Sequence, residues 1–324
     1  MKLGIDIGGA NTKAASADGR FTYSKYLPLW KGCDIAGTLK EISLKAGRID
    51  AVGITITGEL ADCFASKKEG IDYIADAVKK VFPRAVFYGV DGAFHQDTSM
   101  ETQFSAANWM ASAMFLGHIH KNVMFIDIGS TTTDIIPIKD RLPVAGLSDF
   151  DRLARGELVY AGTLRTNIAA LLRHAEVRGL RVRTASELFA ISGDAHLLLD
   201  YINPEDYTCD TPDGGEKDKI SAARRLARVV CCDLDEISPE EAKEIAQQAH
   251  AVQVNDLKEA IGEVSKKNSL HSAVICGLGE FLAIEALQAL GIPFTTLGQA
   301  HGPAISRVFP AYALACLLSE EVKK

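Results

Sequence analysis

The chain lacks the features that mark membrane proteins and nucleic-acid-binding proteins. No run of about 18 apolar residues occurs, so we expect no membrane-spanning helix and no membrane partner. The formal net charge is −7, with 35 Lys and Arg against 42 Asp and Glu, and the basic residues are scattered. Without a basic patch, no nucleic-acid partner is expected.

Cysteine patterns typical of secreted or metal-binding domains are also absent. The seven cysteines are odd in number, and no C-x-x-C pair occurs. Most of them lie in apolar sequence, which indicates reduced, buried thiols instead of a disulfide framework. The chain starts directly with a strand pattern and shows no signal peptide, so the sequence predicts a cytoplasmic protein.

The commoner phosphate-binding motifs are missing as well. There is no G-x-x-x-x-G-K-[ST] sequence, which excludes a Walker P-loop. A dinucleotide-binding fingerprint would need a strand, a glycine-rich turn and then a helix. Here Gly8 and Gly9 are followed by a second strand over 12–16, a hairpin turn and a third strand over 21–27.

What the chain does contain is a pair of matching loops, at residues 3–13 (LGIDIGGANTK) and 125–134 (FIDIGSTTTD). Each is an apolar strand that ends in Asp-Ile-Gly and continues through small or hydroxylated residues into another strand. The two aspartates, Asp6 and Asp127, suit a hydrated Mg²⁺, bound directly or through water, because Mg²⁺ prefers one or two carboxylates together with phosphate oxygens. Two such loops facing each other would form a clamp for a polyphosphate.

The remaining loop residues are the predicted phosphate contacts. Glycine lets backbone N–H groups approach an anion, and hydroxyl groups donate to it. The predicted contacts are Gly8, Gly9, Asn11, Thr12, Lys13, Gly129, Ser130, Thr131 and Thr132. Lys13 is open to two interpretations, since the alternation of its strand directs its ammonium group either to phosphate or to solvent. A single loop of this kind would be an ordinary glycine turn, whereas the repeat favours a phosphate grip.

The repeated strand–loop–strand pattern resembles the phosphate grip of the actin, sugar-kinase and heat-shock-chaperone superfamily. A third element supports the resemblance: an apolar strand over 273–276, a Gly277-Leu278-Gly279 turn, and a helix that begins near Glu280. In that superfamily this position carries the adenosine side of a nucleotide site. The resemblance therefore implies a nucleotide-like pocket at Gly277, Gly279 and Glu280, while the alternative is a tight turn whose glycines serve packing.

The implied fold class is α/β, with two actin- or ribonuclease-H-like domains and a helical insertion in the second. We expect the first domain over residues 1–121, completed by a C-terminal helix over 303–324. The second domain is expected over 122–302, with its insertion at about 149–270. Within the insertion, the sequence predicts helices over 163–175, 186–201, 219–232 and 256–267, and a capped helix start at Ser238-Pro239-Glu240-Glu241.

Three further carboxylates are candidates for catalysis. A buried strand over 51–57 is followed by Glu59 and Asp62, and ligands bind over the strand ends of parallel sheets. Carboxylates there could bind an amine or a metal, or transfer a proton; alternatively, both cap the following turn. Asp91 follows the strand 85–90 in a Val-Asp-Gly turn, where a plain turn residue is the alternative.

Together with the two loops, the stretch 57–62 (TGELAD) resembles the hydantoinase A/oxoprolinase family. Within that family the chain is most similar to the methanofuran-biosynthesis branch, through the stretches 106–112 (AANWMAS), 156–163 (GELVYAGT) and 211–215 (TPDGG). The resemblance extends over essentially the whole chain. The loop motifs are specific to the superfamily, and the longer stretches carry the assignment to the branch.

This branch implies transfer of an alkyl group and not of a phosphoryl group. It joins (5-(aminomethyl)furan-3-yl)methyl diphosphate to the phenol oxygen of γ-glutamyltyramine, which forms an aryl ether and releases diphosphate. Since the cation of a furfuryl-type carbon is delocalised, the enzyme mainly has to stabilise charge on the leaving diphosphate. A phenol pKa of about 10 calls for a base, for which Glu59, Asp62 and Asp91 are all candidates. Arg165 could pair with the glutamyl carboxylate, or be solvated on a helix surface.

The implied cofactor is Mg²⁺, ATP is compatible with the clamp but not required, and the implied partners are small-molecule substrates. Two alternatives stay open. One is an ATP-dependent small-molecule kinase or oxoprolinase-like amidohydrolase that uses the same clamp. The other is a non-catalytic, nucleotide-operated switch, which hydrolysis of ATP without an acceptor would favour. The sequence indicates no oligomeric state.

Overall fold

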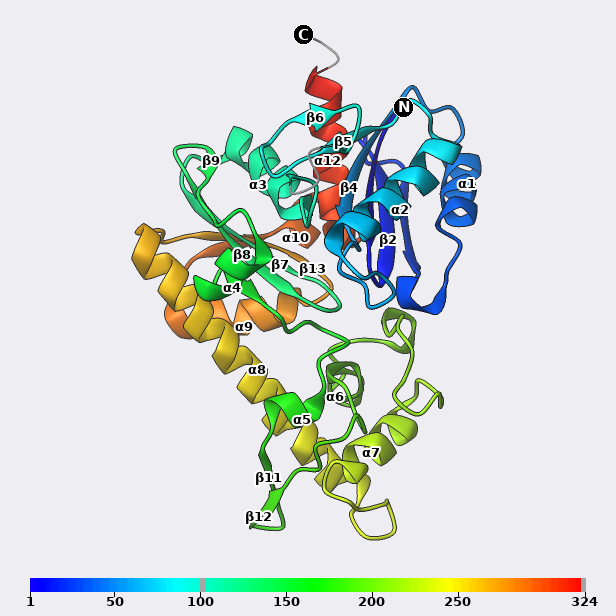
Figure 1. Cartoon of the computed structure of the whole chain (residues 1–324). Helices are drawn as coiled ribbons and strands as arrows, with labels where there is room; N and C mark the ends of the chain where they lie inside the picture. The colour runs from blue at the N-terminus through cyan, green and yellow to red at the C-terminus, as the bar shows by residue number, and fades with distance from the viewer. Residues whose placement is uncertain (100–102, 322–324) are drawn as a thin grey trace. The chain divides into compact units, whose positions relative to one another are not determined.

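The computed structural model of the chain describes residues 1–99 and 103–321 and divides into two compact units (Figure 1). Unit 1 comprises Met1–Phe125, Ile136–Arg155 and Thr295–Lys324, and unit 2 comprises Ile126–Ile135 and Gly156–Phe294. The segment 136–155, which the sequence pattern assigns to the second domain, thus belongs to unit 1. The C-terminal part of unit 1 begins at Thr295, whereas the sequence pattern places its start at residue 303.

Unit 1 is built on a six-stranded sheet in the order β3-β2-β1-β4-β5-β6. Its strands are β1 (Lys2–Gly8), β2 (Asn11–Ser16), β3 (Thr22–Tyr26), β4 (Ala51–Thr57), β5 (Val86–Tyr88) and β6 (Phe94–His95). The first three form an antiparallel meander, whereas β4 pairs in parallel with β1, and β5 in parallel with β4. This is the ribonuclease-H-like arrangement that the sequence predicts.

Helices cover both faces of this sheet (Figure 1). On one face, α1 (Ile35–Ala46) and α2 (Lys67–Val81) pack on a core that includes Leu3, Ile5 and Ile7 of β1. On the other face, α12 (Phe309–Glu321) contacts β1, β2 and β4 and packs on α3 (Asn108–Ile119). A Cβ atom on Gly4 would stand 2.0 Å from the carbonyl oxygen of Ala311, so β1 admits α12 only because it carries glycine there. Side chains alternate along a strand, so Asp6 lies on the same face as Gly4.

The second sheet repeats this strand order. It runs β10-β8-β7-β13-β14, with β9 paired to β8. Its strands are β7 (Val123–Ile128), β8 (Thr133–Lys139), β9 (Leu142–Pro143), β10 (Leu158–Val159), β13 (Ala273–Gly277) and β14 (Phe294–Thr296), and the boundary between the two units falls within β7 and β8. As β9, β8 and β7 correspond in order to β3, β2 and β1, the predicted α/β class with two related sheets is confirmed.

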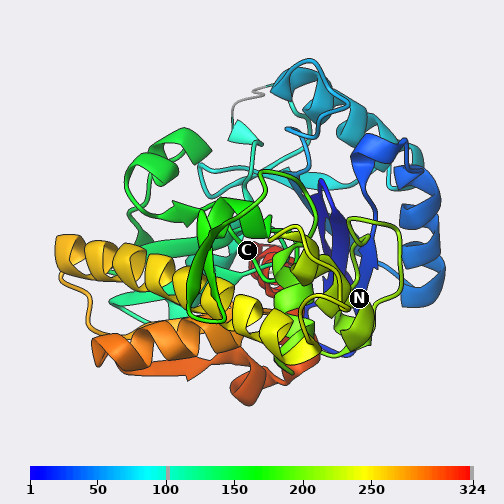
Figure 2. The same ribbon diagram turned by 90° about the horizontal axis from the view of Figure 1, so that it is seen from below.

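The insertion of unit 2 is mainly helical but also contains a hairpin. Its helices are α5 (Ile168–Leu171), α6 (Ser192–Leu198), α7 (Lys219–Arg228) and α8 (Pro239–Asn268), and its hairpin consists of β11 (His174–Val177) and β12 (Leu180–Arg183). α8 begins at the predicted capping box, in which Ser238 and Glu241 bond each other's backbone N–H groups. It lies beside α9 (Glu280–Leu290), as Figure 2 shows.

Several predicted elements are wrong within the insertion and near the C-terminus. Residues 163–175 form a loop, the short α5 and the start of the hairpin, and 186–201 are helical only over α6. Residues 256–267 are helical as predicted, but they belong to the single longer helix α8. The predicted C-terminal helix over 303–324 is divided into α11 (Pro303–Arg307) and α12, and its last three residues, 322–324, lie outside the described residues. A short α10 (Leu297–His301) precedes α11, and α4 (Asp149–Ala154) precedes β10.

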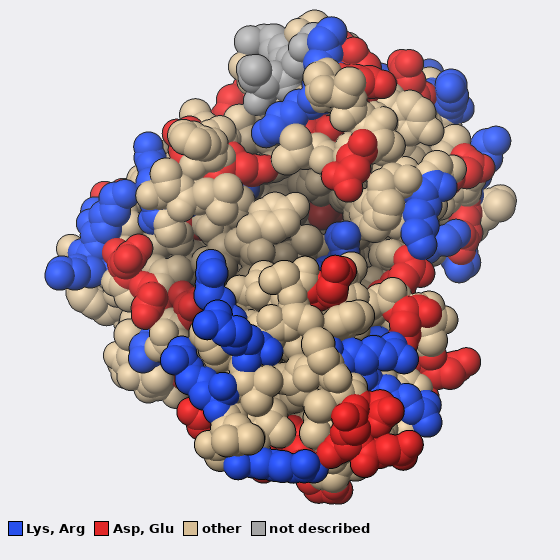
Figure 3. Space-filling model, turned by 60° about the horizontal axis from the view of Figure 1, so that its bottom comes forward, with Lys and Arg blue, Asp and Glu red and all other residues tan. Residues whose placement is uncertain are grey.

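Among residues 1–99 and 103–321, no helix is both long enough and apolar enough to cross a membrane. Figure 3 shows one face of the molecule, on which Lys and Arg side chains are interspersed with Asp and Glu. This distribution agrees with the scattered basic residues of the sequence.

Candidate functional site

Asp6 stands near the end of β1, within the first of the two sequence loops, which we call loop 1 (residues 6–13). Its side chain is only 4% exposed. The hydroxyls of Thr55 and Thr57 donate to its Oδ1 at 3.2 and 2.9 Å, and Asn108 Nδ2 approaches its Oδ2 at 3.4 Å. The parallel pairing of β1 with β4 brings the two threonines beside Asp6, and the first residue of α3 supplies Asn108.

Burial and charge act on Asp6 in opposite directions. Burial raises the pKa of the Asp6 carboxyl above its ordinary value, while the positive charge of Lys13 and the three hydrogen-bond donors lower it. Lys13 is the cross-strand partner of Asp6, and cross-strand partners share a face of the sheet. The register therefore favours the first interpretation of Lys13, in which its ammonium group points toward the phosphate site and not to solvent.

The same register places Thr12 elsewhere. Thr12 is the cross-strand partner of Ile7, whose side chain belongs to the core under α1 and α2. Its hydroxyl is fully buried on that face, opposite to the face of Asp6. The hydroxyl of Thr12 therefore lies on the face of the sheet opposite to Asp6, and contact between Thr12 and phosphate stays a prediction.

Loop 1 packs directly on the segment that follows β4. Gly8 is paired with Thr57, and a Cβ atom on Gly58 would stand 2.9 Å from the carbonyl carbon of Gly8. Gly9 is held through its carbonyl, which accepts from the N–H of Leu29 at 2.9 Å, while Asn11 starts β2. The stretch 57–62 and loop 1 therefore meet at one edge of the sheet, as the sequence predicts for ligand-binding strand ends.

Glu59 is the second buried carboxylate at this edge. It is 2% exposed, its Oε1 accepts a hydrogen bond from Ser105 Oγ, and Ser105 Oγ in turn accepts from Lys67 Nζ at 3.1 Å. Its Oε2 is buried, and no described residue offers it a hydrogen bond. Burial raises the pKa of Glu59, and the hydrogen bond from Ser105 opposes that shift.

The other two carboxylate candidates differ from Glu59 in their surroundings. Asp62 is exposed. Asp91 lies in the turn between β5 and β6, where it accepts from the N–H of Ala93 at 3.2 Å and pairs with His95 at 2.9 Å. These bonds are those of a turn residue, the alternative interpretation of Asp91.

Unit 2 contains the corresponding loop 2 (residues 127–132). Asp127 stands near the end of β7 and is 8% exposed, and the following residues Gly129 to Thr132 are partly exposed. The N–H of Gly129 donates to the carbonyl oxygen of Thr132 at 2.9 Å, which closes the turn. The hydroxyls of Ser130 and Thr131 lie 3.4 Å apart on this turn.

The segment 162–165 braces loop 2. The N–H of Thr163 donates to Gly129 O at 2.9 Å, and those of Leu164 and Arg165 both donate to Ser130 O at 3.0 Å. A Cβ atom on Gly162 would stand 2.6 Å from backbone atoms of Thr131, so the close approach requires glycine.

Arg165 lies on this bracing segment and not on a helix. Its Nη1 donates to Thr131 Oγ1 at 3.1 Å. Arg165 thus contacts Thr131, a predicted phosphate-binding residue, although the sequence suggests the glutamyl carboxylate of the acceptor as its partner.

The glycine turn after β13 packs against loop 2. Gly277 has a φ of +101°, and a Cβ atom on it would stand 2.3 Å from Ile128 O and 2.7 Å from Asp127 Oδ1. A Cβ on Gly279 would stand 2.4 Å from both Ile128 Cγ2 and Thr163 Oγ1. Close packing therefore requires glycine at both positions, which is the alternative to a nucleotide-like pocket. Glu280 begins α9.

Several residues at these sites were not found from the sequence. Asn108 contacts Asp6, although it appeared only within the branch stretch 106–112. The stretch 211–215 has a structural role, because Asp213 pairs with Arg225 at 3.1 Å and Arg225 pairs with the buried Asp194 at 2.8 Å. The only sequence signals were the longer branch stretches themselves, since none of these contacts is local.

The donor set fits Mg²⁺ held together with a phosphate ligand. Among the described residues, no group of three or more His, Cys, Asp or Glu side chains could hold a metal ion. Asp6 nevertheless presents a buried carboxylate whose Oδ2 accepts, within residues 1–99 and 103–321, one long hydrogen bond, from Asn108 at 3.4 Å. Mg²⁺ is usually bound by one or two carboxylates with water and phosphate oxygens. Loop 2 offers Asp127 in the equivalent position of its own strand.

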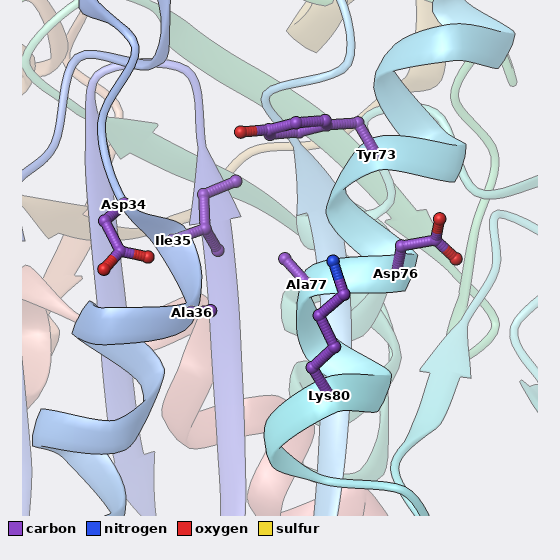
Figure 4. A pocket seen from close by; sticks show the side chains of 7 residues that line it. All are labelled: Asp34, Ile35, Ala36, Tyr73, Asp76, Ala77 and Lys80. Atoms are coloured by element: carbon purple, nitrogen blue, oxygen red, sulfur yellow. The ribbon is translucent and has the colours of Figure 1, made fainter.

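A separate cavity in unit 1 has no connection with the predicted residues. It has a volume of about 200 Å³ and lies between α1 and α2 (Figure 4). Its lining consists of Asp34, Ile35, Ala36, Tyr73, Asp76, Ala77 and Lys80. Since no predicted site residue contributes to it, we assign it no part in the site.

Comparison with known proteins agrees with these motifs. The hydantoinase/oxoprolinase family profile matches residues 50–321. A (4-{4-[2-(gamma-L-glutamylamino)ethyl]phenoxymethyl}furan-2-yl)methanamine synthase of Methanocaldococcus jannaschii is 39% identical over 332 aligned positions, which cover 100% of this chain and 99% of the relative. A synthase of the same name from Methanococcus vannielii is 37% identical over 209 positions, 63% of this chain and 94% of the relative.

Among solved structures, component A of the (R)-2-hydroxyglutaryl-CoA dehydratase of Acidaminococcus fermentans matches with a TM-score of 0.49 and 12% identity, over 100% of this chain and 99% of that one. At that identity the match says nothing about function. The profile match and the full-length relative, by contrast, agree with the paired loops and the stretch 57–62. The chain belongs to the hydantoinase/oxoprolinase family.

Proposed function

We propose that this chain forms the aryl ether named in its relatives, by joining an aminomethylfuran methyl diphosphate to the phenol oxygen of γ-glutamyltyramine. Diphosphate is the leaving group, and the product belongs to methanofuran biosynthesis. The full-length relationship to the archaeal synthase supports this proposal. The cytoplasmic location expected from the sequence stays a prediction.

The observation that carries the proposal is the buried, hydrogen-bonded Asp6 on a phosphate-type loop, with Lys13 on the same face. A carboxylate that is fixed by three donors beside a cation suits a metal–phosphate ligand better than it suits proton transfer. Loop 2 repeats the pattern, with Asp127 at its start and Arg165 against Thr131.

In this proposal each loop supplies charge for the leaving group. Asp6 and Asp127 are the residues that would hold Mg²⁺, and the ion would supply positive charge to offset the negative charge on the leaving diphosphate. Lys13 and Arg165 add positive charge, and backbone N–H groups of the loop glycines donate to phosphate oxygens. The furfuryl carbon then reacts with the phenol oxygen of the acceptor.

The ATP-dependent alternatives find less support. The glycines that suggested a nucleotide-like pocket, Gly277 and Gly279, each have a steric partner in loop 2. Packing against loop 2 is therefore sufficient to explain both glycines, and the proposed reaction needs no nucleotide.

The test is a coupling assay with purified protein, Mg²⁺, the diphosphate donor and γ-glutamyltyramine, without nucleotide. Ether and diphosphate are expected in equal amounts, with losses of about 100-fold or more in Asp6→Asn and Asp127→Asn. The substitution Asp140→Asn, at an exposed turn, is the control and should leave the rate unchanged. If wild-type protein yields no ether in this assay but hydrolyses ATP in a separate assay, the proposal is wrong.

A further inference from the structure

We propose that Glu59 is the group that accepts the proton of the acceptor phenol, with its free Oε2 as the receiving atom. This inference rests on the proposed function and selects one of the three carboxylates that the sequence left open. Its basis is the position of Glu59 beside loop 1, the orientation of its carboxyl group and the state of its second oxygen.

Position is the first argument. β1 and β4 are parallel neighbours, so the chain leaves both strands at the same edge of the sheet. Gly58 packs on Gly8 so closely that a Cβ atom would be 2.9 Å from the Gly8 carbonyl carbon. Glu59 follows directly, and it is therefore adjacent to the loop that is proposed to bind the donor's diphosphate.

Orientation is the second argument. Ser105 Oγ donates to Oε1 of Glu59 and is itself fixed by Lys67 Nζ at 3.1 Å. Ser105 is in turn positioned by a backbone bridge to Ile56 of β4. In addition, Gly70 of α2 approaches the backbone of Glu59 so closely that a Cβ would stand 2.3 Å from its carbonyl oxygen. One carboxyl oxygen is thus held, and the other is left for a ligand.

The free oxygen is the third argument. Oε2 of Glu59 is buried and has no hydrogen-bond partner among the residues that the structure describes, which is an unfavourable state for a polar atom. Such a group calls for an explanation, and a phenolic O–H that arrives with the acceptor would supply the missing partner. Asp62 is exposed and Asp91 is engaged in its own hairpin, so neither presents a comparable oxygen.

The surroundings of Glu59 make its carboxylate a stronger base than an ordinary one. Burial is the largest influence and raises its pKa, and the negative charge of Asp149 acts in the same direction. Ser105 and the positive charge of Lys67 oppose the shift. A base is most effective when its pKa lies closer to the working pH than that of an ordinary carboxylate.

The step balances without any further reactant. The bond between the furfuryl carbon and the diphosphate oxygen breaks, and its electron pair leaves with diphosphate. The phenol oxygen forms the new bond to that carbon, and its proton moves to Oε2 of Glu59. Once the products have left, Oε2 gives this proton to water, which returns Glu59 to its charged form.

The experiment compares Glu59→Gln with wild type using γ-glutamyltyramine and its ring-fluorinated analogues, whose phenols are more acidic. Ether formation with the ordinary phenol should fall about 100-fold or more in Glu59→Gln, within the usual range for loss of a general base. With the fluorinated acceptors, the loss of rate in Glu59→Gln should be at least about tenfold smaller, because a more acidic phenol depends less on a base to remove its proton. Release of diphosphate from the donor into water, without acceptor, should stay within about twofold.

The control is Glu320→Gln, at an exposed glutamate of α12, which should behave as wild type with every acceptor. If Glu59→Gln does not fold, as judged by circular dichroism, Glu59→Asp takes its place and should show a steeper dependence on phenol acidity than wild type.

Two results would overturn the inference: an unchanged rate of ether formation, or a loss that acidic phenols do not restore. If instead wild-type protein forms no ether at all, the proposed function itself fails.

Discussion

Gly277 lies directly against Asp127, so that a Cβ atom on it would stand 2.7 Å from the carboxylate Oδ1 and 2.3 Å from the neighbouring Ile128 carbonyl. The strand β13 is thus fitted to the aspartate that begins loop 2. A glycine with a φ of +101° permits this contact, and no other residue type would do so without moving loop 2.

We therefore expect Gly277→Ala to lower the free energy of unfolding by more than about 2 kcal/mol, from backbone strain and the clash together. The matched control is Gly291→Ala, since Gly291 has a φ of +66° but no atom of the described part of the chain packs within 4 Å of the place that its Cβ would take. The control should lose only about 1–2 kcal/mol, the cost of the left-handed backbone. Urea denaturation measures both, and equal losses would mean that the contact with Asp127 is unimportant.

A second prediction concerns the ion pair inside the insertion. Asp194 and Arg225 are fully buried, 2.8 Å apart, and Tyr207 donates to Asp194 at 2.9 Å. Asp194→Asn would leave the guanidinium buried without its main counter-charge, so we expect a loss of about 3–5 kcal/mol of unfolding free energy. The exposed pair Lys219–Asp200 is the control, and Asp200→Asn should cost no more than about 1 kcal/mol. A small loss for Asp194→Asn in chemical denaturation would contradict this account.

A third prediction concerns pH. His196 is buried, its Nδ1–H donates to Thr163 O at 2.7 Å, and burial lowers its pKa to about 3 from an ordinary value of 6.5. Below pH 6.5 the unfolded chain takes up a proton that the folded chain does not, so stability from this group is complete above pH 6.5 and is lost as pH falls toward about 3. The loss approaches about 1.4 kcal/mol per pH unit within that window.

The measurement is urea denaturation of wild type and His196→Gln between pH 7 and pH 4. As the pH falls, the free energy of unfolding should decrease less steeply in the variant than in wild type, by up to about 1.4 kcal/mol per pH unit. His271→Gln, at an exposed histidine, should run parallel to wild type. Parallel curves for His196→Gln and wild type would rule out the proposed origin of the acid sensitivity.

A fourth prediction concerns Arg165, whose Nη1 contacts Thr131 Oγ1. If Arg165 serves the phosphate side of the site, Arg165→Gln should weaken the binding of inorganic diphosphate with Mg²⁺ by about 10- to 100-fold, the usual range for a charge-assisted hydrogen bond. Titration calorimetry measures this without turnover. Arg155→Gln, at an exposed position, should bind as wild type. Unchanged diphosphate binding together with a raised KM for the acceptor would contradict this role. It would indicate instead that Arg165 binds the glutamyl carboxylate of the acceptor.

The sequence predicts the parts of the fold that local patterns determine. β1, β2 and β3 follow from alternating apolar residues and a glycine turn, and α8 from the Ser238–Glu241 capping box. Loops 1 and 2 follow for the same reason, since each is a continuous stretch. The pairing of Asp6 with Lys13 could not be fixed this way, because one residue of register decides on which face Lys13 lies.

What the sequence could not predict depends on contacts between distant segments. Residues 163–165 were predicted as helix, but their N–H groups donate to loop 2, and this bracing replaces the helical hydrogen bonds. Asn108 reaches Asp6 only because α3 starts at that edge of the sheet. Likewise, Glu59 could be told from Asp62 and Asp91 only once burial and hydrogen-bond partners were known.

The central claim is that the phenol oxygen attacks carbon and that diphosphate leaves, and one labelling experiment tests it most directly. γ-Glutamyltyramine with ¹⁸O in its phenol group is incubated with the diphosphate donor, Mg²⁺ and wild-type protein, and the products are analysed by mass spectrometry. We predict that all of the label is in the ether and none in the released diphosphate. Label in phosphate, or ether that forms only when ATP is added, would contradict the account.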